Sequence, residues 1–145
     1  MEVKELAKDD IQNCAKLIMK AYNGRPWNYQ WTISRAIQYL TELFDSSRFV
    51  GFVIYEDEEL VAAMFAHAKT WWINDLLMID ELFVSALKQG KGYGQALMNS
   101  ARAFSKNNDI GSITLITHKY MPAVSFYEKN KFLQAEQYVL MFNEN

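Results

Sequence analysis

Cysteine is almost absent from this sequence, in which Cys14 is the single example. One cysteine cannot form an internal disulfide, which is consistent with a reducing compartment, and we expect a cytoplasmic protein. Cys14 lies at helical spacing from Ile11, Ile18 and Tyr22. Because free cysteine packs as a small hydrophobe, we expect Cys14 in the core and not as a nucleophile.

Long hydrophobic runs and an excess of charge are also missing. The longest apolar stretch, residues 60–66, is far too short to span a bilayer, and residues 1–5 lack the apolar core of a secretion signal. A formal net charge of −2 gives no electrostatic footprint for nucleic acid. His67 and His118 are too far apart in sequence to suggest a ligand pair, and Cys14 adds no metal spacing. These absences predict a protein with no membrane partner, no nucleic-acid partner and no metal.

The composition that remains is that of a globular domain. Half of the residues are hydrophobic and 14% are aromatic, and 145 residues suffice for one domain, 1–145, with a single core. The apolar periodicity predicts the element order βααβββαβαββ, with no repeat, linker or low-complexity segment. This order is typical of an α/β or α+β fold with a mixed sheet, because hairpins pair the early strands antiparallel and strand–helix–strand crossovers make later strands parallel.

Capping residues and periodicity set the expected bounds of these elements. Asp9 or Asp10 is expected to cap the first helix, and Thr32 the second. The strands are expected at residues 3–7, 49–55, 60–70, a segment ending at residue 84, 112–117, 132–136 and 138–142.

The most informative segment, residues 79–94, joins a strand to a glycine-rich turn and an amphipathic helix. A glycine-lined helix N-terminus presents free backbone N–H groups and the positive end of the helix dipole, which suits a pyrophosphate. Two other phosphate motifs do not fit. A dinucleotide-binding motif would need glycine where Gln95 stands, and a P-loop would need Ser or Thr after Lys91, where the residue is Gly92.

A second motif follows near the C-terminus. Residues 122–132 have the sequence Pro-Ala-Val-Ser-Phe-Tyr-Glu-Lys-Asn-Lys-Phe. With Gln89, Gly92 and Gly94 of the first motif, this segment resembles motifs B and A of the GNAT superfamily of acyl-CoA N-acyltransferases. The two motifs stand in the expected order, and the resemblance covers roughly residues 49–142.

Two positions depart from the family pattern. Lys131 replaces the usual glycine after the motif B helix, so we expect a left-handed helix cap to shift to Asn130. Tyr120 stands where the family often has an asparagine that contacts the coenzyme.

The resemblance implies a fold and a cosubstrate. The fold is a mixed, mostly antiparallel sheet in which two central parallel strands splay apart to admit the pantetheine arm of acetyl-CoA. The residues that would hold the coenzyme are Leu82, Phe83, Val84, Gln89, Gly90, Lys91, Gly92, Tyr93, Gly94 and Tyr127.

Tyr127 matches the motif B tyrosine, which in the family faces the departing sulfur as general acid. A tyrosine near pKa 10 is a reasonable donor to a thiolate whose conjugate acid lies near 8.5. Packing or coenzyme positioning is the alternative role for Tyr127.

Asp80 and Glu81 are the two candidate acids for the acceptor amine. Adjacent strand residues point to opposite faces, so we expect no carboxylate dyad, with Asp80 on the face of Leu82 and Val84 and Glu81 on the face of Phe83. In polyamine and aminoglycoside N-acetyltransferases with similar strands, an acid at the Asp80 position serves the amine. This resemblance favours Asp80, and a structural role for Glu81 stays open. A bulge near Asp80 would exchange the faces.

Aromatic residues at element ends suggest a rim around an acceptor pocket. Trp27 and Trp31 flank the gap between the first two helices, and Trp72 ends a strand. With Asp75, these residues would favour a cation through cation–π contacts and charge. Ordinary packing at the ends of the sheet is the alternative.

The sequence therefore predicts an N-acetyltransferase that moves the acetyl group of acetyl-CoA to a primary amine. The favoured acceptor is a small cationic molecule of the polyamine or aminoglycoside kind. A peptide or protein amine is the enzymatic alternative, and a non-catalytic acyl-CoA sensor is the alternative of another class. A homodimer is left open by analogy with the family.

Overall fold

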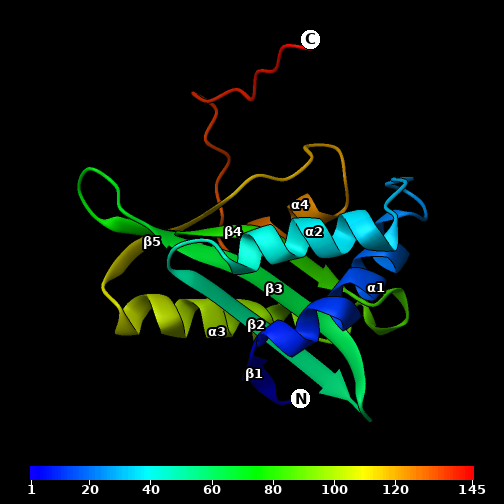
Figure 1. Ribbon diagram of the computed structural model, residues 1–145. Helices are drawn as coiled ribbons and strands as arrows, with labels where there is room; N and C mark the ends of the chain where they lie inside the picture. Colours follow the sequence, from blue (N-terminus) through cyan, green and yellow to red (C-terminus); the bar gives the residue numbers. More distant parts are fainter.

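One five-stranded sheet with helices on both faces forms the body of the protein (Figure 1). The computed structural model describes residues 1–145. Strand order follows the sequence; neighbours from β1 to β4 are antiparallel, and β5 joins β4 in parallel. This mixed, mostly antiparallel sheet confirms the predicted fold class. The strands are β1 (Val3–Glu5), β2 (Phe49–Glu56), β3 (Glu59–Lys69), β4 (Asp75–Val84) and β5 (Ile110–Leu115).

The helices lie in two layers. One face of the sheet is covered by α1 and α2, and the other by α3, with α4 beside the end of the sheet (Figure 1). None of these helices is both long enough and apolar enough to cross a bilayer. They are α1 (Ile11–Tyr22), α2 (Ile33–Phe44), α3 (Tyr93–Asn107) and α4 (Ala123–Lys129).

Each layer has its own hydrophobic cluster, and the strands separate the two. Cys14 of α1 and Leu40 of α2 pack with Phe65 of β3 on one face, all fully buried. Burial also raises the pKa of the Cys14 thiol, so the predicted core role of this cysteine is confirmed. On the other face, Leu97 of α3 packs with Met64 of β3.

The predicted helix caps have different outcomes. The Thr32 hydroxyl accepts a hydrogen bond from the Arg35 backbone N–H at 3.2 Å, which confirms the cap of α2. Asp10 occupies the N-cap position of α1 but makes no capping bond. Its carboxylate instead accepts from the Ala7 N–H at 2.8 Å and from the Tyr55 hydroxyl at 2.6 Å, so it ties the start of α1 to β2.

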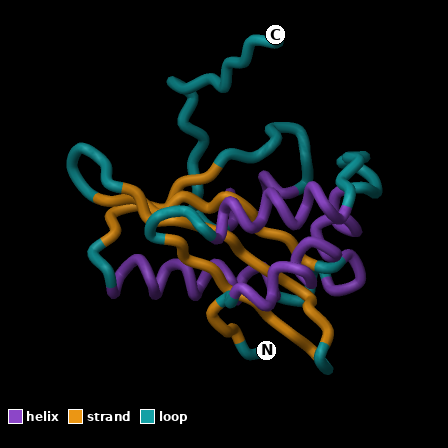
Figure 2. The backbone as a smooth tube through the Cα atoms, in the orientation of Figure 1, coloured by secondary structure: helices purple, strands orange, loops and turns teal.

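The C-terminal part of the predicted order is wrong. The two expected strands at residues 132–136 and 138–142 are not formed, and the chain beyond α4 runs away from the sheet as irregular backbone (Figure 2). As a result β5 is an edge strand instead of a central one. An extended segment becomes a strand only when its backbone pairs, and this segment has one internal backbone bond, from the Tyr138 N–H to the Ala135 carbonyl.

The end of α4 corrects a second expectation. Lys131 itself adopts the left-handed conformation, with φ of 69°, while the φ of Asn130 is −89°. The Phe132 N–H bonds to the Tyr127 carbonyl and the Lys131 N–H to the Glu128 carbonyl, the two bonds of a Schellman motif. Asn130 is the residue before this cap, and its buried side-chain oxygen accepts hydrogen bonds from Gln95 and Arg102.

Replacing Lys131 with glycine should therefore stabilise the protein. Glycine removes the cost of a left-handed non-glycine residue, and part of that gain is lost to the freer unfolded chain. We expect Lys131→Gly to raise the free energy of unfolding by about 0.5–1 kcal/mol, measured by urea denaturation. Lys129→Gly, inside the last turn of α4, is the matched control and should cost about 1 kcal/mol. Equal destabilisation by both variants would contradict the assigned cap.

Candidate functional site

The ladder between β4 and β5 ends halfway along β4. Pairing runs from Asp75 with Ile110 to Ile79 with Leu115, where β5 ends. Residues 80–84 continue β4 without a strand on that side, and residues 116–121 form no strand. The sheet is therefore open between its two parallel strands at this end.

A cleft of about 350 Å³ lies at this opening. Its lining comes from β4, the end of β5, α1, the chain before α2, and α4, so segments far apart in sequence meet here. The lining residues are Ile18, Tyr22, Trp27, Tyr29, Trp31, Ile79, Asp80, Glu81, Leu82, Leu115, Ile116, Thr117, His118, Ala123, Tyr127 and Leu140.

A β-bulge at Asp80 places both acids on one face of β4. The register pairs Ala66 with Ile79 and Phe65 with Glu81, so Asp80 is the extra residue. Glu81 thus shares the α1–α2 face with Phe65, and Asp80 reaches His67 on that same face. The expectation of opposite faces is wrong, because the bulge breaks the strict alternation from which it followed.

Glu81 is held by aromatic hydroxyls at the floor of the cleft. The Tyr39 hydroxyl donates to Glu81 Oε2 at 2.5 Å, and the Tyr39 ring stacks on Trp31 with centroids 5.2 Å apart. Burial raises the pKa of Glu81 to about 7; hydrogen bonds from Tyr39 and Tyr22 oppose the rise, and the charge of Asp80 adds to it. A carboxylate with this pKa can accept a proton near neutral pH, whereas an ordinary one is a poor base.

Asp80 has a different partner. Its Oδ2 lies 2.6 Å from His67 Nδ1, and both side chains are partly exposed. This contact orients the carboxylate and gives it an imidazole through which a proton can move. Asp80 also borders the cleft, so the two acids present two different environments to one ligand.

Tyr127 enters the cleft from α4 and is buried. Its ring packs edge-on against Phe126 and Phe132, with centroids 5.2 and 5.6 Å apart. Burial, and then the negative charge of Glu81, raise the pKa of Tyr127 to about 12. The hydroxyl is therefore fully protonated at neutral pH and electrostatically coupled to Glu81.

The glycine-rich turn leads directly into α3. Gly90 and Gly92 have φ of 75° and 92°, conformations that favour glycine, and Gly92 is the N-cap of α3. At Gly94 a Cβ atom would lie 3.3 Å from the Phe126 ring, so the missing side chain lets α3 approach α4 closely. The first-turn N–H groups of α3 have no partner in the chain and remain available to an anion.

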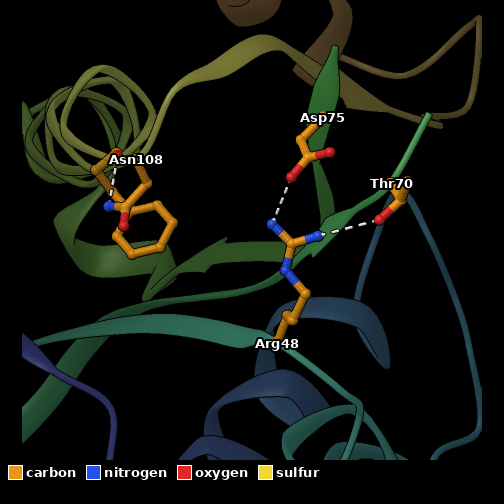
Figure 3. Close-up of polar contacts among 5 residues, drawn as sticks. Arg48, Thr70, Asp75 and Asn108 are labelled. Atoms are coloured by element: carbon orange, nitrogen blue, oxygen red, sulfur yellow. Dashed lines mark hydrogen bonds and ion pairs between the residues drawn. The ribbon is translucent and has the colours of Figure 1, made fainter. Parts of the chain in front are cut away.

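Only part of the predicted aromatic rim lies at the cleft. Trp27 and Trp31 line the cleft, and the Trp27 ring meets Tyr22 edge-on at 5.2 Å between centroids. Trp72 lies outside it, on the loop between β3 and β4, with 82% of its surface exposed. Asp75 begins β4 at the far end from the acids and pairs with Arg48 at 2.7 Å (Figure 3). Neither Trp72 nor Asp75 contributes to the cleft, because each sits at the wrong end of a strand.

Several residues in or beside the cleft, among them Tyr22, Tyr39 and His118, were not predicted from the sequence as site residues. Tyr22 ends the apolar stripe of α1 and was interpreted only as core. Tyr39 lies in α2 between the apolar residues Ile37 and Leu40, and no sequence pattern singles it out. His118 lies in an irregular segment, 6.3 Å from Trp27 between ring centroids. Their shared signal, a polar tip on an aromatic ring, is too common to single them out.

Sequence comparison covers most of the chain. The profile of the acetyltransferase (GNAT) family matches residues 13–132, which include both motifs and the cleft residues up to Tyr127. No curated protein sequence matches the chain.

Solved structures share the fold at low sequence identity. A transcriptional regulator from Bacillus halodurans is 18% identical, with a TM-score of 0.81 over 98% of this chain and 99% of that chain. An aminoglycoside N-acetyltransferase, AAC(6')-Iy, in complex with coenzyme A is 11% identical, with a TM-score of 0.75 over 99% of this chain and 93% of that chain. The family profile, supported by this likeness of fold, shows that the chain belongs to the GNAT family of acetyltransferases.

Proposed function

We propose that the protein is an N-acetyltransferase that moves the acetyl group of acetyl-CoA directly to a primary amine of a small cationic acceptor. One observation carries the proposal. Two carboxylates of different environment, Asp80 and Glu81, and a buried tyrosine, Tyr127, border one cleft where β4 and β5 separate. Direct transfer needs a proton acceptor for the amine and a proton donor for the thiolate, and this cleft offers both.

The coenzyme fits the open end of the sheet. Its pyrophosphate would bind the first turn of α3, where Gly90 and Gly92 leave the backbone accessible. The pantetheine arm would run along residues 82–84 of β4, which have no strand partner on the β5 side. Gln89 already donates to the Val84 carbonyl at 3.4 Å and would lie beside the same arm. The absence of a side chain at Gly94 brings α4, and with it Tyr127, close to this path.

The reaction then follows from the positions of these groups. The ammonium loses a proton to Glu81, and the free amine nitrogen attacks the thioester carbonyl carbon. The C–N bond forms, and backbone N–H groups of β4 stabilise the oxyanion without reorganising. The C–S bond breaks, and the thiolate takes a proton from Tyr127. The second proton of the attacking nitrogen passes to the Tyr127 oxygen and restores the phenol, and Glu81 releases the first proton to solvent. The products are the acetylated amine and coenzyme A.

Glu81 and Tyr127 are coupled in this sequence of steps. The negative charge of Glu81 is one of the two causes that raise the pKa of Tyr127. Once Glu81 has taken the proton of the amine, that charge is gone and Tyr127 becomes a stronger acid. Activation of the amine thus prepares the donor for the leaving group.

The walls of the cleft favour a cationic acceptor. Tyr22, Trp27 and Tyr29 form an aromatic group with centroids 5.2–6.0 Å apart, above two carboxylates. Aromatic faces and carboxylates both attract ammonium groups. Several structural relatives are aminoglycoside acetyltransferases. This agrees with the proposed acceptor class, although at such low identity the likeness speaks for the fold alone.

A panel of amines with thiol release as readout tests the proposal. Polyamines, aminoglycosides and lysine-containing peptides are each offered with acetyl-CoA. Turnover of small polycations supports the proposed acceptor. Turnover of peptides alone would replace it with a peptide or protein amine. Tight coenzyme binding without release by any amine would favour a non-catalytic acyl-CoA sensor.

The coenzyme site has a matched pair of variants at Gly92. Aspartate and asparagine both tolerate a positive φ and have the same size, so they differ only in charge. A carboxylate beside the pyrophosphate adds repulsion of about 1–4 kcal/mol at contact distance. We therefore expect Gly92→Asp to weaken coenzyme A binding by tenfold or more relative to Gly92→Asn, measured by calorimetry. Equal affinities of both variants and of the parent protein would remove the basis for this coenzyme site.

A further inference from the structure

Asn130 is a buried polar residue that the proposed reaction leaves unused. It follows α4 directly, is 5% exposed, and is one of two buried polar residues in the protein. Its side-chain oxygen accepts from Gln95 at 2.9 Å and from Arg102 at 3.1 Å. Its side-chain nitrogen donates to the Phe126 carbonyl at 3.0 Å. A buried amide with three such bonds is held in one orientation and fixes the groups that it joins.

The bonds of Asn130 join the helix that begins at the coenzyme turn to the helix that carries Tyr127. Gln95 is the third residue of α3, inside the first turn whose free N–H groups face the proposed pyrophosphate site. Arg102 lies seven residues further along, two turns away on the same face of α3. Both side chains therefore reach from α3 to the end of α4, and one of them starts at the coenzyme turn itself.

The guanidinium of Arg102 serves the end of α4 and no acidic residue. It donates to the side-chain oxygen of Asn130 and, at 2.5 Å, to the backbone carbonyl of the same residue, and it forms no ion pair. A cation on a carbonyl at the C-terminal end of a helix also complements the negative end of the helix dipole. Because α4 has only seven residues, its position depends on such contacts with the rest of the fold.

Contacts with the first turn of α3 lie on both sides of Tyr127 in the sequence. After it, the Asn130 N–H donates to the Tyr127 carbonyl at 3.0 Å, and the Asn130 side chain is bonded to Gln95. Before it, the Phe126 ring lies against Gly94, where a Cβ atom would be 3.3 Å from the ring. The backbone of Tyr127 is thus fixed relative to the same turn that would hold the coenzyme.

We propose that Asn130 is a positioning residue that fixes the hydroxyl of Tyr127 relative to the coenzyme-binding turn of α3. Gln95 transmits the position of that turn to α4, and Arg102 holds the end of α4 in place. The inference rests on the proposed function in taking Tyr127 as the proton donor and the first turn of α3 as the coenzyme site. A misplacement of about 1 Å can cost about 10²-fold in rate, so the bonds of Asn130 matter to the reaction although Asn130 touches neither substrate.

Two substitutions of Asn130 test the link to α3 by kinetics. Alanine removes all three side-chain bonds, whereas aspartate keeps an oxygen for Gln95 and Arg102. We expect Asn130→Ala to lower kcat by about 10–10²-fold with the KM for acetyl-CoA nearly unchanged, and Asn130→Asp to restore most of that loss. Equal losses in the two variants would assign the effect to the bond with the Phe126 carbonyl and overturn the link to α3.

The Tyr127→Phe background separates positioning from a general loss of stability. There Asn130→Ala should lower kcat by less than about twofold, because no hydroxyl remains to be positioned. A loss as large as in the parent protein would overturn the inference. Asn108→Ala is the matched control, since it removes a side-chain bond to the Phe104 carbonyl near the other end of α3 (Figure 3). It should leave kcat unchanged in both backgrounds.

A spectroscopic readout without turnover keeps the inference separate from the proposed function. In protein with isotopically labelled tyrosine, the ring signal of Tyr127 is identified by its loss in Tyr127→Phe. We expect Asn130→Ala to shift this signal by more than its line width, and Gln95→Met, at an exposed position that does not endanger folding, to shift it in the same direction. An unchanged signal in both variants would overturn the inference. A shifted signal in a protein that acetylates no amine would support the inference and remove the proposed function.

Discussion

Glu81→Gln should lower turnover by about 10²–10⁴-fold, the usual range for loss of a general base. The amide keeps the size of the side chain and can still accept the hydrogen bond from Tyr39, so the floor of the cleft is preserved. It cannot take a proton from the acceptor ammonium. Coenzyme A affinity should change little, because Glu81 lies on the α1–α2 face of β4 and the glycine-rich turn lies beyond the end of that strand.

Asp80→Asn is the matched comparison on the neighbouring residue. It removes one negative charge from the cleft and weakens the contact with His67. We expect a higher KM for a cationic acceptor and a smaller fall in kcat than in Glu81→Gln. The reverse order, with collapse in Asp80→Asn and near-normal turnover in Glu81→Gln, would move the base to Asp80. Full activity in both variants would discard carboxylate assistance altogether.

The raised pKa of Glu81 also predicts a pH profile. The base must be deprotonated, so kcat/KM should fall as the pH drops below about 7, the pKa that burial gives Glu81. Tyr39→Phe removes a hydrogen bond that lowers this pKa. The acidic limb of the profile should then move to higher pH. A purely structural role for Tyr39 would reduce activity without moving the limb.

The raised pKa of Glu81 also makes the free energy of unfolding depend on pH, which can be measured without an activity assay. Its pKa is about 7 in the folded protein against 4.5 as the ordinary value, so the folded state holds the extra proton between these limits. Stability is therefore lost as the pH rises from about 4.5 through about 7. Glu81→Gln removes that loss, and urea denaturation of both proteins at pH 5 and pH 8 measures it.

The two motifs and the fold class follow from the sequence because each rests on local chemistry. The glycine-rich turn before an amphipathic helix and the pattern around Tyr127 are short local patterns that resemble the GNAT family, and the family profile matches both. For the same reason, the helical spacing of apolar residues placed Cys14 in the core correctly. The preference of threonine for the start of a helix identified the Thr32 cap of α2. These features depend on residues near one another in the chain.

The errors concern features that depend on distant partners. Asp80 was placed on the wrong face of β4, whereas Glu81 lies on the face of Phe83 as expected. Asp80 is the extra residue of a bulge, and nothing in the sequence of β4 marks that bulge. Trp72 and Asp75 were placed near a pocket because position along a strand does not reveal which end is open. The C-terminal strands failed because a strand exists only once another chain segment pairs with it.

Tyr127→Phe should lower turnover by about 10²-fold or more while coenzyme A still binds, because only the hydroxyl is removed. The ring contacts with Phe126 and Phe132 persist in the variant, so α4 keeps its position. Calorimetry checks coenzyme affinity, and single-turnover measurements check that the chemical step, not product release, is slowed. A fall below about threefold would leave Tyr127 a packing residue, since general acid catalysis gives far larger effects.

The coupling to Glu81 makes the Tyr127 experiment more specific. In the resting enzyme burial and the Glu81 charge hold the pKa of Tyr127 near 12, which is too high for easy proton donation to a thiolate near 8.5. Neutralisation of Glu81 by the proton of the amine removes the smaller of these two causes and lowers the pKa of Tyr127, which makes donation easier, while burial still holds that pKa above its ordinary value. The amide of Glu81→Gln carries no charge either, so Tyr127 should still donate in that variant, and the double variant should be slower than Glu81→Gln alone by about the factor that Tyr127→Phe costs the parent protein. A double variant no slower than Glu81→Gln alone would mean that Tyr127 does not donate to the thiolate once the charge at position 81 is gone.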